Sequence, residues 1–318
     1  MKINYRTRST AFKSDAAAVL AQADAICQDY NRQGYRLTLR QLYYRFIATD
    51  AFPESRMDPD LGTKNTFQNY KWLQGLIVQG RENGMIDWNH IEDRGRESAG
   101  GDGGWDDPAD AMDSIARQYR ISHWDGQPEH VEVWVEKDAL TDVIARAASP
   151  LNVSYTACKG SPSASLVHES ARRLANIEMD ESRSTTVLYL GDHDPTGLDI
   201  PRDIQERFWR YGSKCHVERI ALNLDQVQQY DPPPNFAKET DSRYARYVEE
   251  YGTDCWELDA LEPAVLVDLV TSEIEARLDR SLYDERLAQE ERERRILNTI
   301  SDNWDAVRDY VEDEIGIG

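Results

Sequence analysis

Residues 185–197 have the sequence TTVLYLGDHDPTG, an apolar run that ends in two aspartates, Asp192 and Asp194. A short apolar run of this kind predicts a buried β-strand. Three further segments predict strands and are separated by helical patterns: residues 130–137, 152–158 and 215–222. Strands that alternate with helices are typical of a mainly parallel sheet. We therefore expect an α/β domain over residues 126–318, with a helical and highly charged C-terminal extension.

Acidic residues stand at the ends of two of these predicted strands. Glu136 closes the strand at 130–137, and Asp192 and Asp194 close the strand at 185–192. In an open parallel sheet the ligand site lies beyond the carboxyl ends of the strands, so these acids should converge. Three carboxylates so close together favour a hard cation, and we predict Mg²⁺ or Mn²⁺ as the ligand. The alternative is that the aspartates cap a helix and that Glu136 pairs with a lysine or arginine. In an extended D-x-D segment the middle residue, His193, should point away from the acids.

A strand-to-helix turn at residues 158–165, CKGSPSAS, offers a candidate anion site. Lys159 and the N-terminus of the following helix could accept a phosphate. The same pattern also fits an ordinary connection, in which Gly160 allows a tight turn.

The first 100 residues have a different pattern from the rest. Apolar periodicity predicts helices at 14–33 and 67–83 and a third, LRQLYYRFIA, that opens after Thr38. The segment MIDWNHIED, 85–93, predicts a short strand or hairpin. Three helices followed by a hairpin suggest a winged helix-turn-helix domain over residues 1–100. The Gly/Asp-rich stretch that follows predicts a linker and a connecting helix over residues 101–125.

The helix after Thr38 contains two adjacent tyrosines. Tyr43 lies on the apolar stripe of the helix, so we expect it in the core. Tyr44 is off that stripe and follows Arg40 by four residues, so we expect its hydroxyl to face solvent beside a guanidinium group. A nearby cation favours the phenolate and can hold a phosphodiester, which would suit a nucleophile. The alternative is an amphipathic tyrosine at an interface.

Charge is distributed unevenly along the chain. The net charge is −21, yet residues 1–100 carry 14 Lys and Arg against 12 Asp and Glu, a net charge of +2. Only this segment has the balance that phosphate binding favours. The excess of arginine over lysine and of aspartate over glutamate also suggests adaptation to high salt. Our candidates for DNA contact are Arg36, Arg45, Lys71, Arg81, Arg94, Arg96 and Lys159.

Several classes of protein are disfavoured. The four cysteines form no C-x-x-C pair, which argues against a zinc site or a disulfide framework. No apolar run has the length of a membrane span, and the first ten residues lack the apolar core of a signal peptide. We therefore expect a cytoplasmic protein with no membrane partner.

The motifs RQLYYR, VEK, KGSPS and GDHDPTG together resemble the A subunit of topoisomerase VI and the related meiotic double-strand-break transesterase. The resemblance covers roughly residues 37–270 and is strongest to compact, plasmid- or virus-associated forms. It implies a winged-helix domain with a tyrosine nucleophile, Tyr44, and a motif arginine, Arg40. It also implies a Toprim domain whose Mg²⁺ ligands are Glu136, Asp192 and Asp194.

The resemblance carries expectations about the reaction. Tyr44 would attack one DNA strand and form a 5′-phosphotyrosyl link, with Arg40 and Glu136 assisting. Two protomers would form a homodimer in which Tyr44 of one chain meets the acids of the other, so that double-stranded DNA is cut on both strands. The chain has no G-x-x-x-x-G-K-[ST] motif, so ATP-driven strand passage would need a separate ATPase subunit. Gln41 stands where the family has aspartate after the motif arginine.

Two other functions fit the same motifs. In a metal-dependent nuclease the acids would activate water and Tyr44 would merely contact DNA. In a non-catalytic DNA-binding protein the fold would remain without cleavage, which the acidity outside residues 1–100 favours.

Overall fold

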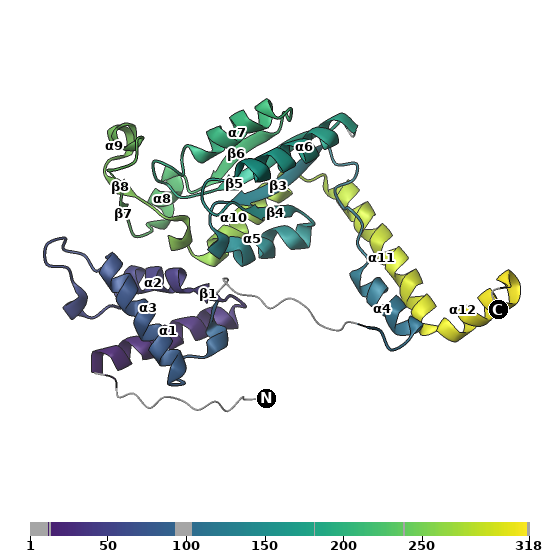
Figure 1. Ribbon diagram of the computed structural model, residues 1–318, viewed down its shortest axis with the longest axis horizontal. Helices are drawn as coiled ribbons and strands as arrows, with labels where there is room; N and C mark the ends of the chain where they lie inside the picture. The colour runs from purple at the N-terminus through teal and green to yellow at the C-terminus, as the bar shows by residue number, and fades with distance from the viewer. Residues whose placement is uncertain (1–11, 13, 93–103, 181, 238, 317–318) are drawn as a thin grey trace.

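The computed structural model describes residue 12 and residues 14–92, 104–180, 182–237 and 239–316. The chain forms an N-terminal helical domain, an α/β domain and an arm of helices that extends from the α/β domain (Figure 1). Separate clusters of buried apolar side chains lie in the two domains. In the described part of the chain, no helix is both long and apolar enough to cross a membrane.

The α/β domain is built on a four-stranded parallel sheet in the strand order β4-β3-β5-β6. The strands are β3 (Glu129–Val135), β4 (Ser154–Ala157), β5 (Ser184–Leu190) and β6 (His216–Ala221). Because successive side chains of a strand point to opposite faces, Val133 and Val135 of β3 pack in one cluster and Trp134 in another. The prediction of an α/β fold with a parallel sheet is confirmed.

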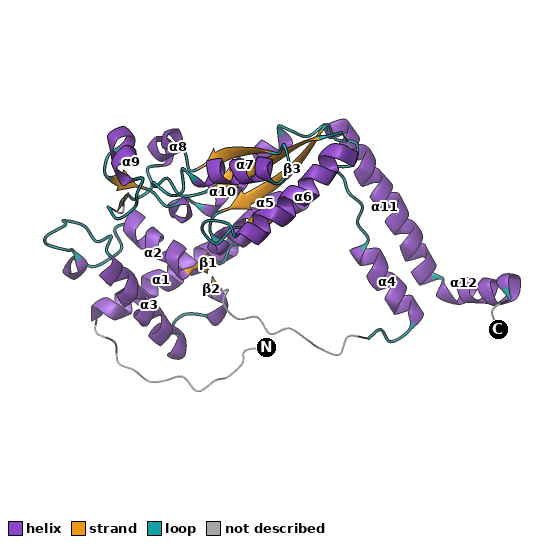
Figure 2. Cartoon of the chain, turned by 45° about the horizontal axis from the view of Figure 1, so that its top comes forward, coloured by secondary structure: helices purple, strands orange, loops and turns teal. Residues whose placement is uncertain are grey.

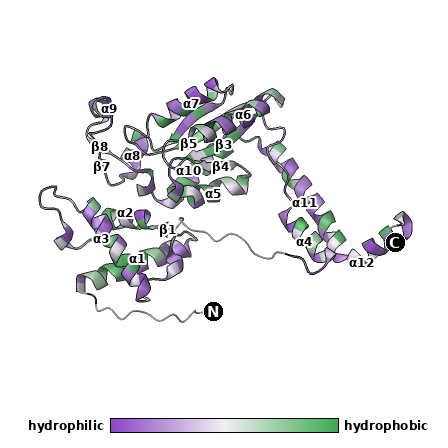
Figure 3. Ribbon diagram, viewed as in Figure 1, coloured by the Kyte–Doolittle hydropathy of each residue, from purple (hydrophilic) through white to green (hydrophobic). Residues whose placement is uncertain are grey.

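Helices cover both faces of the sheet (Figure 2). One face carries α5 (Thr141–Ala148) and α10 (Pro263–Glu275), and the other carries α6 (Ala164–Asp180) and α7 (Ile200–Arg210). Hydrophobic residues are concentrated on the strands between these helices (Figure 3). A sheet buried on both faces explains why the C-terminal parts of its central strands, residues 133–135 and 187–190, are apolar at every position.

Shorter elements connect β6 to α10 and form one side of the site described below. They are α8 (Leu224–Tyr230), β7 (Asn235–Phe236), α9 (Tyr244–Tyr251), β8 (Asp254–Cys255) and a 3₁₀ turn (Leu258–Ala260). β7 and β8 pair antiparallel. This pairing holds residues 235 and 257 near each other, since Asn235 Nδ2 donates to Glu257 Oε1 at 3.3 Å.

The described part of the N-terminal domain contains three α-helices, as predicted. They are α1 (Ser14–Arg32), α2 (Leu39–Ala48) and α3 (Phe67–Glu82). Thr38 caps α2, because its Oγ1 accepts the Gln41 N–H while the Gln41 side chain accepts the Thr38 N–H. Gln41 therefore stabilises the N-terminus of α2.

Over the described residues, the segment after α3 contains a short strand, one of the two predicted forms, and not a hairpin. Residues 88–90 form a 3₁₀ turn, which Asp87 caps by accepting the Asn89 N–H at 2.8 Å. The chain continues as β2 (Ile91–Glu92), which pairs in parallel with β1 (Leu37–Thr38). Burial of Ile91 in the N-terminal core favours this pairing over a turn back on the same segment. Residues 93–103, which include the first three residues of the predicted linker, lie outside the described residues.

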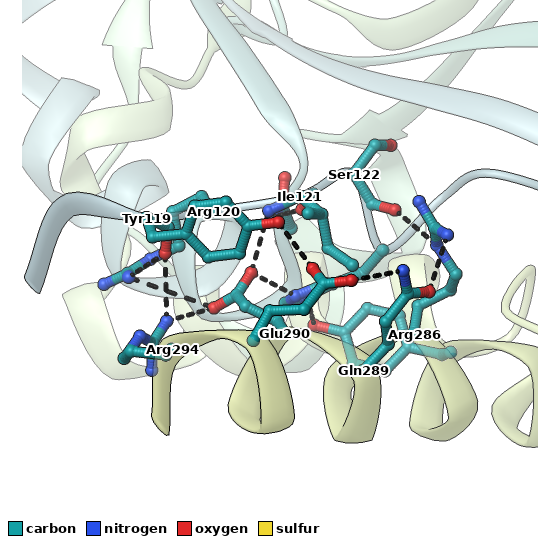
Figure 4. A network of polar contacts seen from close by, with 12 residues as sticks. Tyr119, Arg120, Ile121, Ser122, Arg286, Gln289, Glu290 and Arg294 are labelled. Carbon is teal, nitrogen blue, oxygen red and sulfur yellow. Dashed lines mark hydrogen bonds and ion pairs between the residues drawn. The ribbon is translucent and has the colours of Figure 1, made fainter. Parts of the chain in front are cut away.

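The arm consists of three helices, α4 (Pro108–Gln118), α11 (Arg280–Asp302) and α12 (Trp304–Tyr310). α4 lies along α11 (Figures 1 and 2). The predicted solvated helix at the C-terminal end is α11, yet one of its acids, Glu290, is buried. Glu290 Oε2 accepts the Ile121 N–H at 3.0 Å (Figure 4). The same oxygen also lies 2.8 Å from His123 Nε2. This network fixes α11 to the segment that leads into β3.

Candidate functional site

Two neighbouring strands end at an acidic edge of the sheet. Glu136 follows β3, and Asp192 and Asp194 follow β5. Because β3 and β5 are parallel neighbours, their carboxyl ends lie at the same edge. The Glu136 N–H donates to the Leu190 carbonyl at 2.8 Å, and Glu136 Oε2 accepts the Asp192 N–H at 3.0 Å. The backbone thus holds Glu136 directly beside Asp192.

All three acids that the sequence pointed to line one cleft of about 530 Å³. Asp194 Oδ1 accepts the Gly197 N–H at 2.6 Å, which closes a turn at the cleft wall. Two glycines allow this close packing. A Cβ at position 191 would lie 2.7 Å from Glu136 Oε2, and one at position 197 would lie 2.2 Å from the Asp192 carbonyl oxygen.

His193 points away from the cleft, as expected for the middle residue of the D-x-D segment. Its ring packs against Tyr247, Tyr251 and Trp256, and its Nδ1 lies 3.0 Å from the Tyr247 hydroxyl. Burial lowers the pKa of His193 to about 4. A neutral, packed histidine has a structural role here.

Two acids outside the predicted set, Glu257 and Asp259, join the site. Glu257 and Asp259 follow β8, and together with Asp192 they offer carboxylate oxygens that lie within 4.8 Å of one another. This cluster could hold a metal ion. The ammonium group of Lys137 contacts all three carboxylates, at 3.0 Å from Asp192 and 2.8 Å from Asp259. The alternating acids in the segment WELDAL, residues 256–261, indicate a possible acidic site. The sequence does not show that this segment lies beside strands β3 and β5.

The acids at the cleft repel one another. Burial and the neighbouring Asp194 raise the pKa of Glu136, although the Asp192 N–H opposes the shift. Burial raises the pKa of Asp192 to about 7, with Lys137 opposing and Glu136 adding to the shift. A bound cation would relieve this repulsion and favour the ionised carboxylates.

Tyr44 is buried, which corrects the expectation that its hydroxyl faces solvent. Both tyrosines are covered, Tyr43 at 4% and Tyr44 at 2% exposure. α2 packs not only on its own domain but also on the 3₁₀ turn of the α/β domain, whose Ala260 joins the N-terminal core. The apolar stripe of α2 indicates only the surface that packs within its own domain, so it could not predict this second contact.

The surroundings of the Tyr44 hydroxyl are polar. It accepts a hydrogen bond from Asn235 Nδ2 at 2.9 Å, and a pocket of about 220 Å³ next to it is lined by Arg40, Asn235 and Glu257 among others. Burial raises the pKa of Tyr44, and Glu257 adds to the shift more than Arg40 opposes it. Arg40 does lower the pKa of Tyr44, as expected, but burial and the neighbouring acids outweigh it, so the phenol stays protonated more readily than a free tyrosine.

Arg40 lies between the tyrosine and the acids. Its guanidinium pairs with Glu257 and lies 3.4 Å from Asp259 Oδ2. The same group is 6.0 Å from the centre of the Tyr44 ring. Gln41, by contrast, is engaged in the cap of α2 and takes no part in this set.

The predicted DNA-contacting residues are spread over several elements. Arg45 is not on the surface, because its guanidinium is buried against the Ala260 carbonyl and paired with Glu262. Arg36 is exposed and donates to the Asn89 carbonyl at 3.0 Å.

The remaining basic candidates lie apart from one another. Arg81 donates to the Ile91 carbonyl, while Lys71 is exposed on α3. Lys159 is exposed beyond β4, 3.5 Å from Asp138 Oδ2. Arg94 and Arg96 lie outside the described residues.

Comparison with protein-family models, curated proteins and solved structures finds no match for this chain.

Proposed function

We propose that the protein cleaves DNA by transesterification, with the phenolic oxygen of Tyr44 as the nucleophile. The observation that carries the proposal is that the Tyr44 pocket and the acidic cleft share three lining residues, Arg40, Asn235 and Glu257. A hydroxyl nucleophile, a guanidinium group and a cluster of carboxylates therefore adjoin one another. These are the groups that phosphodiester transesterification needs.

In this proposal Glu136, Asp192 and Asp194 hold Mg²⁺ or Mn²⁺, since carboxylate oxygens suit a hard cation. The bound ion would neutralise charge on the phosphate oxygens. Arg40 would orient the scissile phosphate by exchanging its acidic partners for phosphate oxygens. The phenol O–H and the phosphorus–O3′ bonds break as the phenolic oxygen bonds to phosphorus, and the proton ends on the free 3′-hydroxyl. A 5′-phosphotyrosyl link results.

The same proposal assigns roles to the domains. The N-terminal helices would act as a winged-helix DNA-binding unit and the α/β domain as a Toprim domain, as in the topoisomerase VI A subunit. Because Tyr44 is 2% exposed, the contact of α2 with the turn at 258–260 would open to admit DNA. In a homodimer the released Tyr44 would meet the acids of the partner protomer. Strand passage would require a separate ATPase subunit.

The test uses supercoiled plasmid with Mg²⁺ or Mn²⁺, with and without protease before electrophoresis. The proposal expects linear or nicked DNA that becomes visible only after proteolysis, with protein attached at the 5′ end. Cleaved DNA with free 5′-phosphates and no attached protein would overturn it.

A metal-dependent nuclease that uses water is the second candidate. The burial of Tyr44 and its hydrogen bond to Asn235 favour it, since the acidic cleft is open while the tyrosine is covered. Cleavage that persists unchanged in Tyr44→Phe but fails in Glu136→Gln would identify this activity.

A further inference from the structure

Lys137 directly follows Glu136, a candidate metal ligand, and its ammonium group lies among carboxylates. Its side chain is 16% exposed, and its ammonium group contacts Asp192, Glu257 and Asp259. An ammonium group has three donors, and here each donor faces one carboxylate. These three carboxylates are also the ones whose oxygens are spaced for a metal ion.

One carboxylate oxygen of this cluster accepts no hydrogen bond from the described residues. Asp259 is 1% exposed, and its Oδ2 has no hydrogen-bond partner among the described residues, with Arg40 Nε at 3.4 Å. A buried carboxylate oxygen without a hydrogen bond is costly. It is an available ligand for a second cation if Lys137 is removed.

The charges around the cleft limit how many ions it can take. The carboxylates are five: Glu136, Asp192, Asp194, Glu257 and Asp259. Among the described residues, three cationic side chains are near these carboxylates: Lys137, Arg40 and the partly buried Arg219. Arg219 donates to the Asp192 carbonyl at 2.7 Å and interacts electrostatically with Glu136 and Asp194. Asp241, which also lines the cleft, pairs with Arg243. The excess is two negative charges, which one divalent ion would balance.

We propose that Lys137 is a built-in cation that takes the place of a second divalent ion. The cleft then binds one divalent ion, at Glu136, Asp192 and Asp194, and the cluster of Asp192, Glu257 and Asp259 binds another only when Lys137 is absent. The inference rests on the divalent site of the proposed function, but it does not depend on DNA cleavage.

The test counts bound Mn²⁺ by the electron paramagnetic resonance signal of free Mn²⁺, in the wild type and in Lys137→Met. The wild type should bind one ion, and the variant should bind two. Lys214→Met is the matched control, because Lys214 is exposed just before β6, at the opposite edge of the sheet. The control should bind one ion. Thermal unfolding of each protein with and without Mn²⁺ provides a second readout. Mn²⁺ should raise the unfolding temperature of Lys137→Met by more than it raises that of the wild type.

Each outcome decides the matter. Two ions in the wild type would overturn the inference, even if Lys137→Met does not fold. A folded variant that binds no more Mn²⁺ than the wild type would also overturn it. No ion in the wild type and one in the variant would support the role of Lys137 and instead count against the divalent site of the proposed function.

Discussion

The Tyr44 hydroxyl and the Asn235 side chain form a hydrogen bond of 2.9 Å that joins the helical domain to the α/β domain. These residues are 191 positions apart in the chain, so this contact depends wholly on how the domains pack. Arg45 and the Ala260 carbonyl make a second link across the same interface. The tyrosine that resembles a nucleophile is thus also part of a domain interface.

Removal of the Asn235 amide should loosen this interface. We expect Asn235→Ala to lower the free energy of unfolding by at least about 1 kcal/mol, because the hydrogen bonds that its side chain makes with Tyr44, Glu257 and Asn65 are lost. Nitration of Tyr44 by tetranitromethane, followed by mass spectrometry, should increase several-fold. Asn303→Ala is the control, since Asn303 is exposed at the end of α11. Equal nitration of Tyr44 in the wild type and in Asn235→Ala would contradict this role for Asn235.

The two adjacent tyrosines provide a matched pair for the chemistry. Tyr44→Phe should reduce the covalent protein–DNA adduct at least about 1000-fold, because the nucleophile is lost. Tyr43→Phe should retain the adduct, since the Tyr43 hydroxyl is bonded to Asn65 and Thr66 at 3.0 Å. Denaturing gels with end-labelled DNA measure both. Similar loss in the two variants would point to damage of α2 instead of loss of a nucleophile.

Divalent metal should stabilise the protein because it relieves repulsion at the cleft. With Mg²⁺ or Mn²⁺ at 100 times its dissociation constant, we expect a gain of about 2.7 kcal/mol, which EDTA reverses. Glu136→Gln and Asp194→Asn should reduce this gain. Glu129→Gln should keep it, since Glu129 is at the opposite end of β3. Differential scanning calorimetry measures the shift, and an equal gain in all of these proteins would place the ion elsewhere.

Stability should depend on pH through Glu132 on β3. Burial alone would raise the pKa of Glu132, but hydrogen bonds with His130 and Arg173 outweigh it and lower the pKa to about 2. A carboxyl group whose pKa is depressed on folding stabilises the fold above its unfolded pKa. That contribution is lost as the pH falls from about 4.5 toward 2.

Comparison with Glu132→Gln isolates this effect. The variant should be less stable than the wild type by about 3 kcal/mol at pH 7, and the difference should shrink as the pH approaches 3. Urea unfolding at pH 7, 4 and 3 measures it. The exposed Glu206→Gln should change stability by less than about 0.5 kcal/mol. A difference for Glu132→Gln that is the same at every pH would refute the assignment.

Local patterns predicted much of the architecture. The apolar run at 185–190 and the valine alternation at 131–135 are properties of single strands, and both strands lie in the parallel sheet. The cap at Thr38 depends on Gln41, only three residues away, so the local sequence also indicated where this helix begins. The convergence of Glu136 with Asp192 followed from a general rule for parallel strands.

The rest depended on contacts between distant segments. The exposure of Tyr44 was mispredicted because one helix shows the stripe it buries in its own domain but not a second surface that covers it. Lys137 contacts Glu257 and Asp259, about 120 residues away, and no local pattern indicates this. Strand and helix periodicity come from local backbone geometry, so the sequence alone specifies them. Which charges neutralise one another at the cleft is set by the packing of two domains, and only the tertiary structure decides that.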